Sequence, residues 1–185
     1  MRDHLNVTHI RKLLLKPSTD VRLLCRHDGE LLVSDTHFMC SLPESSLVFD
    51  SRALWAELPT EEGQVWAREG NTSNRPRYNN ATAKWVEWCA TAATPLVCSE
   101  YAHIAYDGQI TRIFVLPDGK RTFVAECYTS ILKFPPCDYE WRATGGQHQA
   151  IVAFRDGKAL VIIMPKAADF FVSEELGLVM ETDIE

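Results

Sequence analysis

The sequence predicts an α+β protein with an internal duplication, and three observations support this fold class. Segments with helical periodicity alternate with short apolar strands, several of which meet at Asp-Gly turns. A polar, Asn-rich segment at 71–80 divides the chain near its middle and is typical of a linker. Several residues also recur in the same order, at offsets of 72 to 74 positions.

The first predicted unit, residues 1–70, begins with a helix at 6–16. Asn6 or Thr8 can cap this helix, and Pro17 ends it. Strands follow at 20–26 and, after an Asp-Gly turn, at 30–42, with an irregularity around Asp35. A short helix at 51–58 and a strand at 63–69 complete the unit.

The second predicted unit, residues 81–170, repeats this order after the linker. A helix is expected at 81–93, where Pro95 stops it, and a second helix at 125–134. Strands are expected at 96–106, 110–116, 123–124, 139–143, 150–154 and 159–164. Residues 171–185 form an acidic tail.

Aligning the two units gives a series of matched residues. The pairs are Asn6 with Asn80, Thr8 with Thr82, Cys25 with Cys98, Asp35 with Asp107, Leu42-Pro43 with Leu116-Pro117, Phe49 with Phe123, and Leu58 with Leu132. A catalytic aspartate has no reason to recur with its surroundings, whereas an aspartate that accepts backbone N–H groups at a turn does. We therefore interpret Asp35 as structural.

These patterns resemble the domains of bacterial sliding clamps, the processivity factors of DNA polymerase III. The segments 34–38 (SDTHF) and 105–109 (AYDGQ) look like the clamp's Thr-Asp-Gly-His-Arg turn. Residues 123–134 look like its strand and second helix, and 161–165 (VIIMP) like its closing apolar-Met-Pro strand. The chain departs from the family by having Thr36 in place of glycine, a truncated first unit, and two repeats instead of three.

The resemblance implies two tandem clamp-like repeats of antiparallel sheet with helices on one face. It implies a non-catalytic protein of DNA replication or DNA-bound assemblies, whose partners are double-stranded DNA and replication proteins. A ring of six domains would then require a homo-oligomer of three chains. No catalytic residue, metal or cofactor is expected.

Cations on the predicted helices and linker are the candidate DNA contacts: Arg11, Lys12, Lys16, Arg52, Arg75, Arg77, Lys84 and Lys133. Glu57, Glu87 and Glu126 lie on the same helices, so ordinary mixed-charge surfaces remain an alternative. The net charge of −6 argues against a surface covered with phosphate-binding lysines, but it leaves room for a local basic face.

The composition, 46% hydrophobic and 24% charged, is typical of a soluble globular protein. No apolar run approaches the ~18 residues that a membrane span needs, and no signal peptide is recognised, so a cytoplasmic location without membrane contact is expected. Six cysteines without a C-x-x-C pair predict reduced, buried thiols and no zinc site.

Two other functions remain open. The first is a small protein-binding or inhibitor module, such as one from a mobile element, that uses the fold as a scaffold. Its candidate contacts are Trp85 and Trp88, which share a helix face but are core residues by default, and Leu176 and Leu178 in the tail. The second is an enzyme that uses Asp35, Asp107 or His37, although no catalytic motif with suitable spacing is present.

Overall fold

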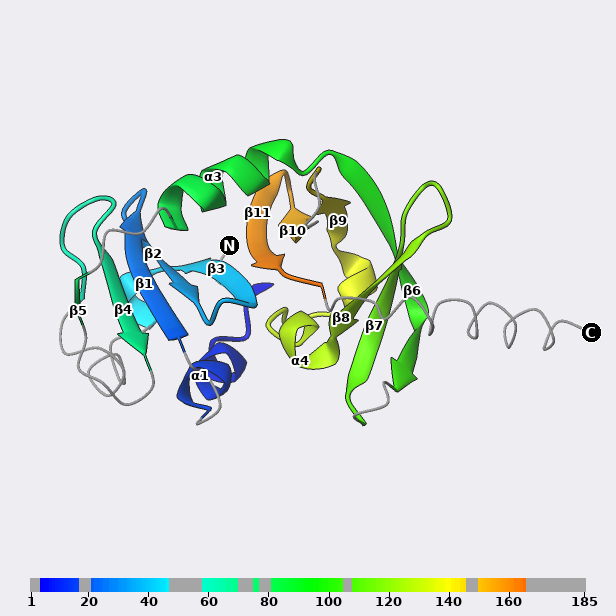
Figure 1. Ribbon diagram of the computed structural model, residues 1–185, viewed down its shortest axis with the longest axis horizontal. Helices are drawn as coiled ribbons and strands as arrows, with labels where there is room; N and C mark the ends of the chain where they lie inside the picture. The colour runs from blue at the N-terminus through cyan, green and yellow to red at the C-terminus, as the bar shows by residue number, and fades with distance from the viewer. Residues whose placement is uncertain are drawn as a thin grey trace, which may run out of the picture.

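The computed structural model describes residues 4–16, 21–46, 58–69, 75–76, 81–104, 108–145 and 150–165. These residues form an α+β protein in which a single antiparallel sheet of 11 strands carries three helices (Figure 1). No helix among them is long and apolar enough to cross a membrane.

The elements follow the chain in two groups. The first group is α1 (Val7–Leu15), β1 (Val21–His27), β2 (Glu30–Ser34), β3 (Phe38–Leu42), the 3-10 turn η2 (Glu44–Ser46), β4 (Val65–Glu69) and β5 (Arg75–Pro76). The second group is α3 (Ala81–Thr91), β6 (Thr94–Ile104), β7 (Ile110–Val115), β8 (Arg121–Ala125), α4 (Glu126–Thr129), the 3-10 turn η3 (Pro136–Asp138), β9 (Glu140–Ala143), β10 (Ile151–Arg155) and β11 (Lys158–Ile163).

The sheet joins the two halves of the chain. Its strand order is β5-β4-β1-β2-β3-β11-β10-β9-β6-β7-β8, and β3 pairs directly with β11 at its centre. Strand β6 pairs with β9 through Thr94–Leu96 and then with β7, across a register shift between Cys98 and Ala102. The described residues therefore form one continuous sheet and do not show a tandem repeat.

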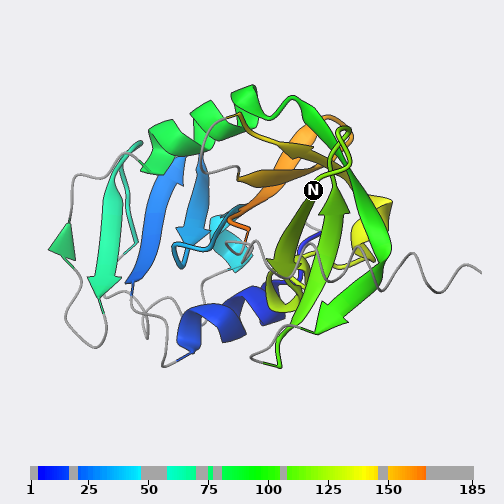
Figure 2. The ribbon, with the colours of Figure 1, turned by 45° about the vertical axis from the view of Figure 1, so that its right-hand side comes forward.

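The helices cover both faces of this sheet, so the expectation of helices on one face is wrong. Helix α1 packs on one side through Ile10, Leu13 and Leu14, whereas α3 packs on the other through Ala81 and Trp85. Figure 2 shows α3 and α1 on opposite sides of the strands. The physical reason is that β1, β2 and β11 are apolar in nearly continuous runs, so both of their faces need cover.

Helix α1 confirms the sequence prediction. The Asn6 side chain accepts a hydrogen bond from the His9 N–H at 3.1 Å and caps the first turn. At the other end the buried guanidinium of Arg22 donates to the carbonyl oxygens of Leu14 and, at 2.9 Å, Lys16. These contacts satisfy backbone acceptors that the helix leaves unpaired.

Two predicted elements are shorter or divided in the structure. The strand expected at 30–42 is a hairpin, β2 and β3, with its turn at 35–37. The helix expected at 125–134 ends after Thr129. Beyond it the N–H groups bond outside the helix: Lys133 donates to the His4 carbonyl oxygen at 2.9 Å and Phe134 to the Tyr139 hydroxyl at 3.3 Å. The helix expected at 51–58 and the turn at Asp107 lie outside the described residues.

Candidate functional site

The β2–β3 turn and the end of β11 meet at one place in the fold. The backbone N–H of Met164 donates to the His37 carbonyl oxygen at 2.7 Å. The two segments that carry the clamp resemblance in this region, 34–38 and 161–165, are therefore in direct contact. Nothing in the sequence spacing requires this, because more than a hundred residues separate them.

Asp35 holds the turn together. Its side chain is 5% exposed, and one carboxylate oxygen, Oδ1, accepts the N–H groups of His37 at 2.9 Å and Phe38 at 3.0 Å. The Tyr128 hydroxyl donates to the same carboxylate. Burial raises the pKa of Asp35, and these hydrogen bonds offset only part of the increase. The structural interpretation of Asp35 is confirmed, because its carboxylate is committed to the backbone of its own turn.

His37 is exposed and covers the Tyr128 ring. The two rings stack at 5.7 Å with an angle of 6° between their planes. Burial, followed by the nearby Asp35 carboxylate, raises the pKa of Tyr128, so its hydroxyl stays protonated and able to donate. The His37 backbone, not its imidazole, contacts Asp35.

A hollow of about 650 Å³ opens beside this contact, and we call it the His37 groove. Its walls come from the end of α1, the β2–β3 turn, the start of β7, the β8–α4 junction and the end of β11. It is lined by Lys16, His37, Gln109, Ile110, Ala125, Glu126, Cys127, Tyr128, Met164 and Pro165. The lining is mixed: apolar residues such as Ile110 and Met164 stand beside polar and charged ones, and Glu126 is paired with Arg112 at 2.6 Å.

A smaller hollow of about 180 Å³, which we call the Trp88 pocket, lies on the α3 side of the same turn. Leu23, Met39, Ile162, Lys84 and Trp88 contribute to it. His37 and Met164 line both the groove and the pocket, so these two residues separate the two hollows.

The candidate DNA contacts do not form one surface. Arg11, Lys12 and Lys16 are exposed on or beside α1, whereas Lys84 lies on α3, across the sheet. The candidate cations on α1 and α3 therefore lie on opposite sides of the sheet, and their contact with DNA stays a prediction. Lys133 is exposed beyond α4, and only the backbone of Arg75 is described, in β5. Arg52 and Arg77 lie outside the described residues.

The predicted partner contacts lie in different environments. Trp85 is 8% exposed and belongs to the core beneath α3, so its assignment as a partner contact is wrong. Trp88 is half-buried and lines the Trp88 pocket, and the Lys84 Nζ lies 5.6 Å from the centre of its ring. Leu176 and Leu178 lie outside the described residues.

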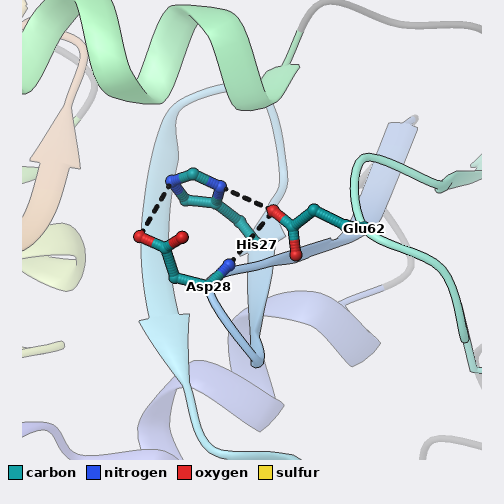
Figure 3. A group of neighbouring side chains, drawn as sticks. All are labelled: His27, Asp28 and Glu62. Carbon is teal, nitrogen blue, oxygen red and sulfur yellow. Dashed lines mark hydrogen bonds and ion pairs between the residues drawn. The ribbon is translucent and has the colours of Figure 1, made fainter.

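A cluster of His27, Asp28 and Glu62 is the one group of potential metal ligands found among the described residues (Figure 3). The imidazole lies between the carboxylates, with Nδ1 3.0 Å from Glu62 and Nε2 3.7 Å from Asp28. Partial desolvation raises the pKa of Glu62, but hydrogen bonds from His27 and the Asp28 N–H outweigh it, so the pKa is lowered. Both ring nitrogens are thus engaged, and the hydrogen bonds of Glu62 with His27 and the Asp28 N–H attach the Glu62 loop to the β1–β2 turn.

All six cysteines are thiols, but the prediction that they are buried holds only for some of them. Cys25 and Cys40 are buried, Cys89 and Cys98 are partly buried, and Cys127 and Cys137 are exposed. Burial raises the pKa of Cys89 to about 11.

Sequence reasoning did not identify Tyr128 or Met164 as site residues. Met164-Pro165 served only as a resemblance motif. Tyr128 carried no signal, because its role depends on a contact with a turn that lies about ninety residues earlier in the chain. No protein-family model matches this chain, and a search of curated proteins finds no relative.

Proposed function

We propose that this protein is a non-catalytic binding protein with a clamp-like fold, which joins DNA-bound or replication assemblies by docking a protein segment in the His37 groove. The observation that carries the proposal is the contact between the 34–38 turn and the 161–165 strand end. These two segments bear the clamp resemblance, and together they line the groove.

The character of the groove supports a peptide ligand. Its volume of about 650 Å³ suits a few apolar side chains. Ile110 is 45% exposed, and Met164 supplies a flexible apolar wall that can adapt to different partners. Lys16 at the rim adds one positive charge that can orient an acidic partner residue.

The charge distribution favours a protein partner over DNA as the direct ligand. The net charge is −6, and the candidate cations lie on both sides of the sheet. Direct DNA contact remains a second candidate because α1 exposes Arg11, Lys12 and Lys16 close together. If α1 binds DNA, changing Arg11 and Lys12 to Ala should weaken retention on duplex DNA and reduce its dependence on salt.

The proposal has two further parts. The two halves of the chain arose by duplication, and three chains can assemble into a ring. The matched pairs Leu42-Pro43 and Leu116-Pro117 stand at the ends of β3 and β7, and α1 and α3 precede the strands that carry the matched Cys25 and Cys98, which supports a duplication. Docking in the groove does not require a ring. Measuring the mass in solution distinguishes a trimer, which a ring requires, from a monomer or dimer that works as an adaptor.

Site-specific photo-cross-linking tests the docking proposal. A photoreactive residue replaces Ile110 in the groove or, as the matched control, Val97, which is an equally apolar strand residue, 70% exposed, outside the groove lining. In extract of the source organism, we expect the Ile110 probe to capture a protein that is also found in the DNA-bound fraction. Capture of the same proteins from both positions, or of none from Ile110, would contradict the proposal.

A further inference from the structure

Cys98 and Cys137 are neighbours in the fold, although they lie 39 residues apart in the chain. Cys98 belongs to β6 and Cys137 to the turn η3. The Cys137 thiol donates to the Cys98 carbonyl oxygen at a sulfur–oxygen distance of 3.7 Å, and the Cys98 thiol donates to the Ser99 carbonyl oxygen at 3.6 Å.

The core holds the two segments in this position. The Trp141 Nε1–H donates to the Pro136 carbonyl at 2.8 Å, which anchors η3. The Trp141 ring packs at 4.7 Å on Phe114, and Phe114 is the β7 residue directly opposite Cys98. The Trp141–Phe114 pair therefore packs between the turn that carries Cys137 and the strand that pairs with Cys98.

We propose that Cys98 and Cys137 form a reversible disulfide, with a low-molecular-weight disulfide such as oxidised glutathione as the oxidant. The pair differs from the other cysteines in having one exposed thiol next to a partly buried one. This inference is independent of the docking function proposed above.

The reaction proceeds by two thiol–disulfide exchanges. The Cys137 thiolate attacks one sulfur of oxidised glutathione, forms a mixed disulfide and releases one glutathione thiolate, which takes up a proton. Cys98 then loses its proton and attacks the Cys137 sulfur, which releases the second glutathione. The two protein thiols are oxidised with the loss of two hydrogens, and the oxidant is reduced to two thiols.

Exposure fixes the order of the two steps. Burial, together with the neighbouring Cys137, raises the pKa of the Cys98 thiol to about 12, so Cys98 carries little thiolate. Cys137 is open to solvent and meets the oxidant first. Because one member of the pair is exposed, reduced glutathione can reopen the bond, which is the behaviour of a regulatory disulfide.

The experiment equilibrates the purified full chain with glutathione buffers of graded ratio. We expect the Cys98 and Cys137 thiols, two of the six in the chain, to disappear together as the buffer becomes more oxidising. Peptide mapping should show one Cys98–Cys137 cross-link, and the melting temperature should rise on the order of 5 °C. Added reduced glutathione should restore all the thiols.

Three single variants serve as controls. Cys127→Ser, at another exposed cysteine, should oxidise like the wild type. Cys137→Ser should not form the cross-link, and Cys98→Ser should retain glutathione as a stable adduct on Cys137, because the resolving thiol is absent. A stable Cys137 adduct in the wild type, or a cross-link between other cysteines, would overturn the proposal.

Discussion

The two turns of the β1–β2–β3 meander differ in how they are stabilised. The first turn is formed by its backbone conformation: Asp28 and Gly29 both have positive φ, 50° and 73°, and the Asp28 carboxylate lies in solvent. The second turn is stabilised by the Asp35 side chain, which is buried and accepts two backbone N–H groups.

The second turn also tolerates an unfavourable backbone conformation. Thr36 has φ of 78°, a region that favours glycine, and it stands where the clamp motif has glycine. The buried carboxylate compensates for this strain. An aspartate in a turn can therefore be either a solvated surface group or the centre of a structural site, and burial decides which.

Removing the Asp35 carboxylate should have the largest effect. Asp35→Ala leaves two backbone N–H groups and the Tyr128 hydroxyl without their acceptor, so the free energy of unfolding should fall by about 2–4 kcal/mol. Asp35→Asn keeps one acceptor oxygen and should cost about half as much. Urea denaturation measures both, and a near-neutral Asp35→Ala variant would remove the contrast between the two turns.

The titration of Asp35 gives the next prediction. Its folded pKa is raised above the ordinary value of 3.8, so the folded state binds the proton more tightly than the unfolded state. The protonation-linked part of the stability is therefore complete below the unfolded value of 3.8 and is lost as the pH rises through the raised folded pKa, while the hydrogen bonds to the turn remain. Measured against Asp35→Asn, the free energy of unfolding of the wild type should fall with rising pH. A rise would show that the pKa of Asp35 is lowered in the folded state, not raised.

Glycine substitutions should act in opposite directions at the two turns. Gly29→Ala places a side chain at φ 73°, with nothing within 4 Å of the added Cβ, so its cost of about 1 kcal/mol comes from the backbone alone. Thr36→Gly relieves strain and should be neutral or slightly stabilising. The melting temperatures of the two variants measure both effects. A clear fall in the melting temperature of Thr36→Gly would mean that Thr36 is not strained.

The smallest effect is expected at the exposed cluster of the first turn. Glu62→Gln breaks the ion pair with His27 but leaves the Asp28-Gly29 backbone unchanged, and exposed pairs contribute little. We expect the same urea midpoint as the wild type. Added zinc should also leave the melting temperature of the wild type unchanged, and zinc-dependent stabilisation lost in Glu62→Gln would identify a metal site there.

Local signals in the sequence predicted local structure well. The turns at Asp28-Gly29 and Asp156-Gly157 and the helix that Asn6 caps are confirmed, because each depends on residues close together in the chain. The sequence predicted that Pro135 stops the helix expected at 125–134, but the helix ends after Thr129, because the Lys133 N–H bonds to the His4 carbonyl, a contact that depends on the folded chain.

Features that depend on distant contacts could not be predicted in the same way. Whether α3 lies with α1 or across the sheet depends on which strands pair, and apolar runs such as Leu31–Val33 are compatible with either arrangement. The His37 groove combines residues from the end of α1 to the end of β11. Asp35 could be interpreted from its turn, but the role of Tyr128 required the folded structure.

The central claim is that the His37 groove docks a peptide, and one measurement tests it most directly. Short peptides are selected by display against the full chain, and the affinity of the best one is compared for the wild type, Ile110→Glu and Val97→Glu. The account predicts that Ile110→Glu weakens binding at least about tenfold, which corresponds to about 1.4 kcal/mol, while Val97→Glu leaves it unchanged. Equal affinity for Ile110→Glu and the wild type would contradict it.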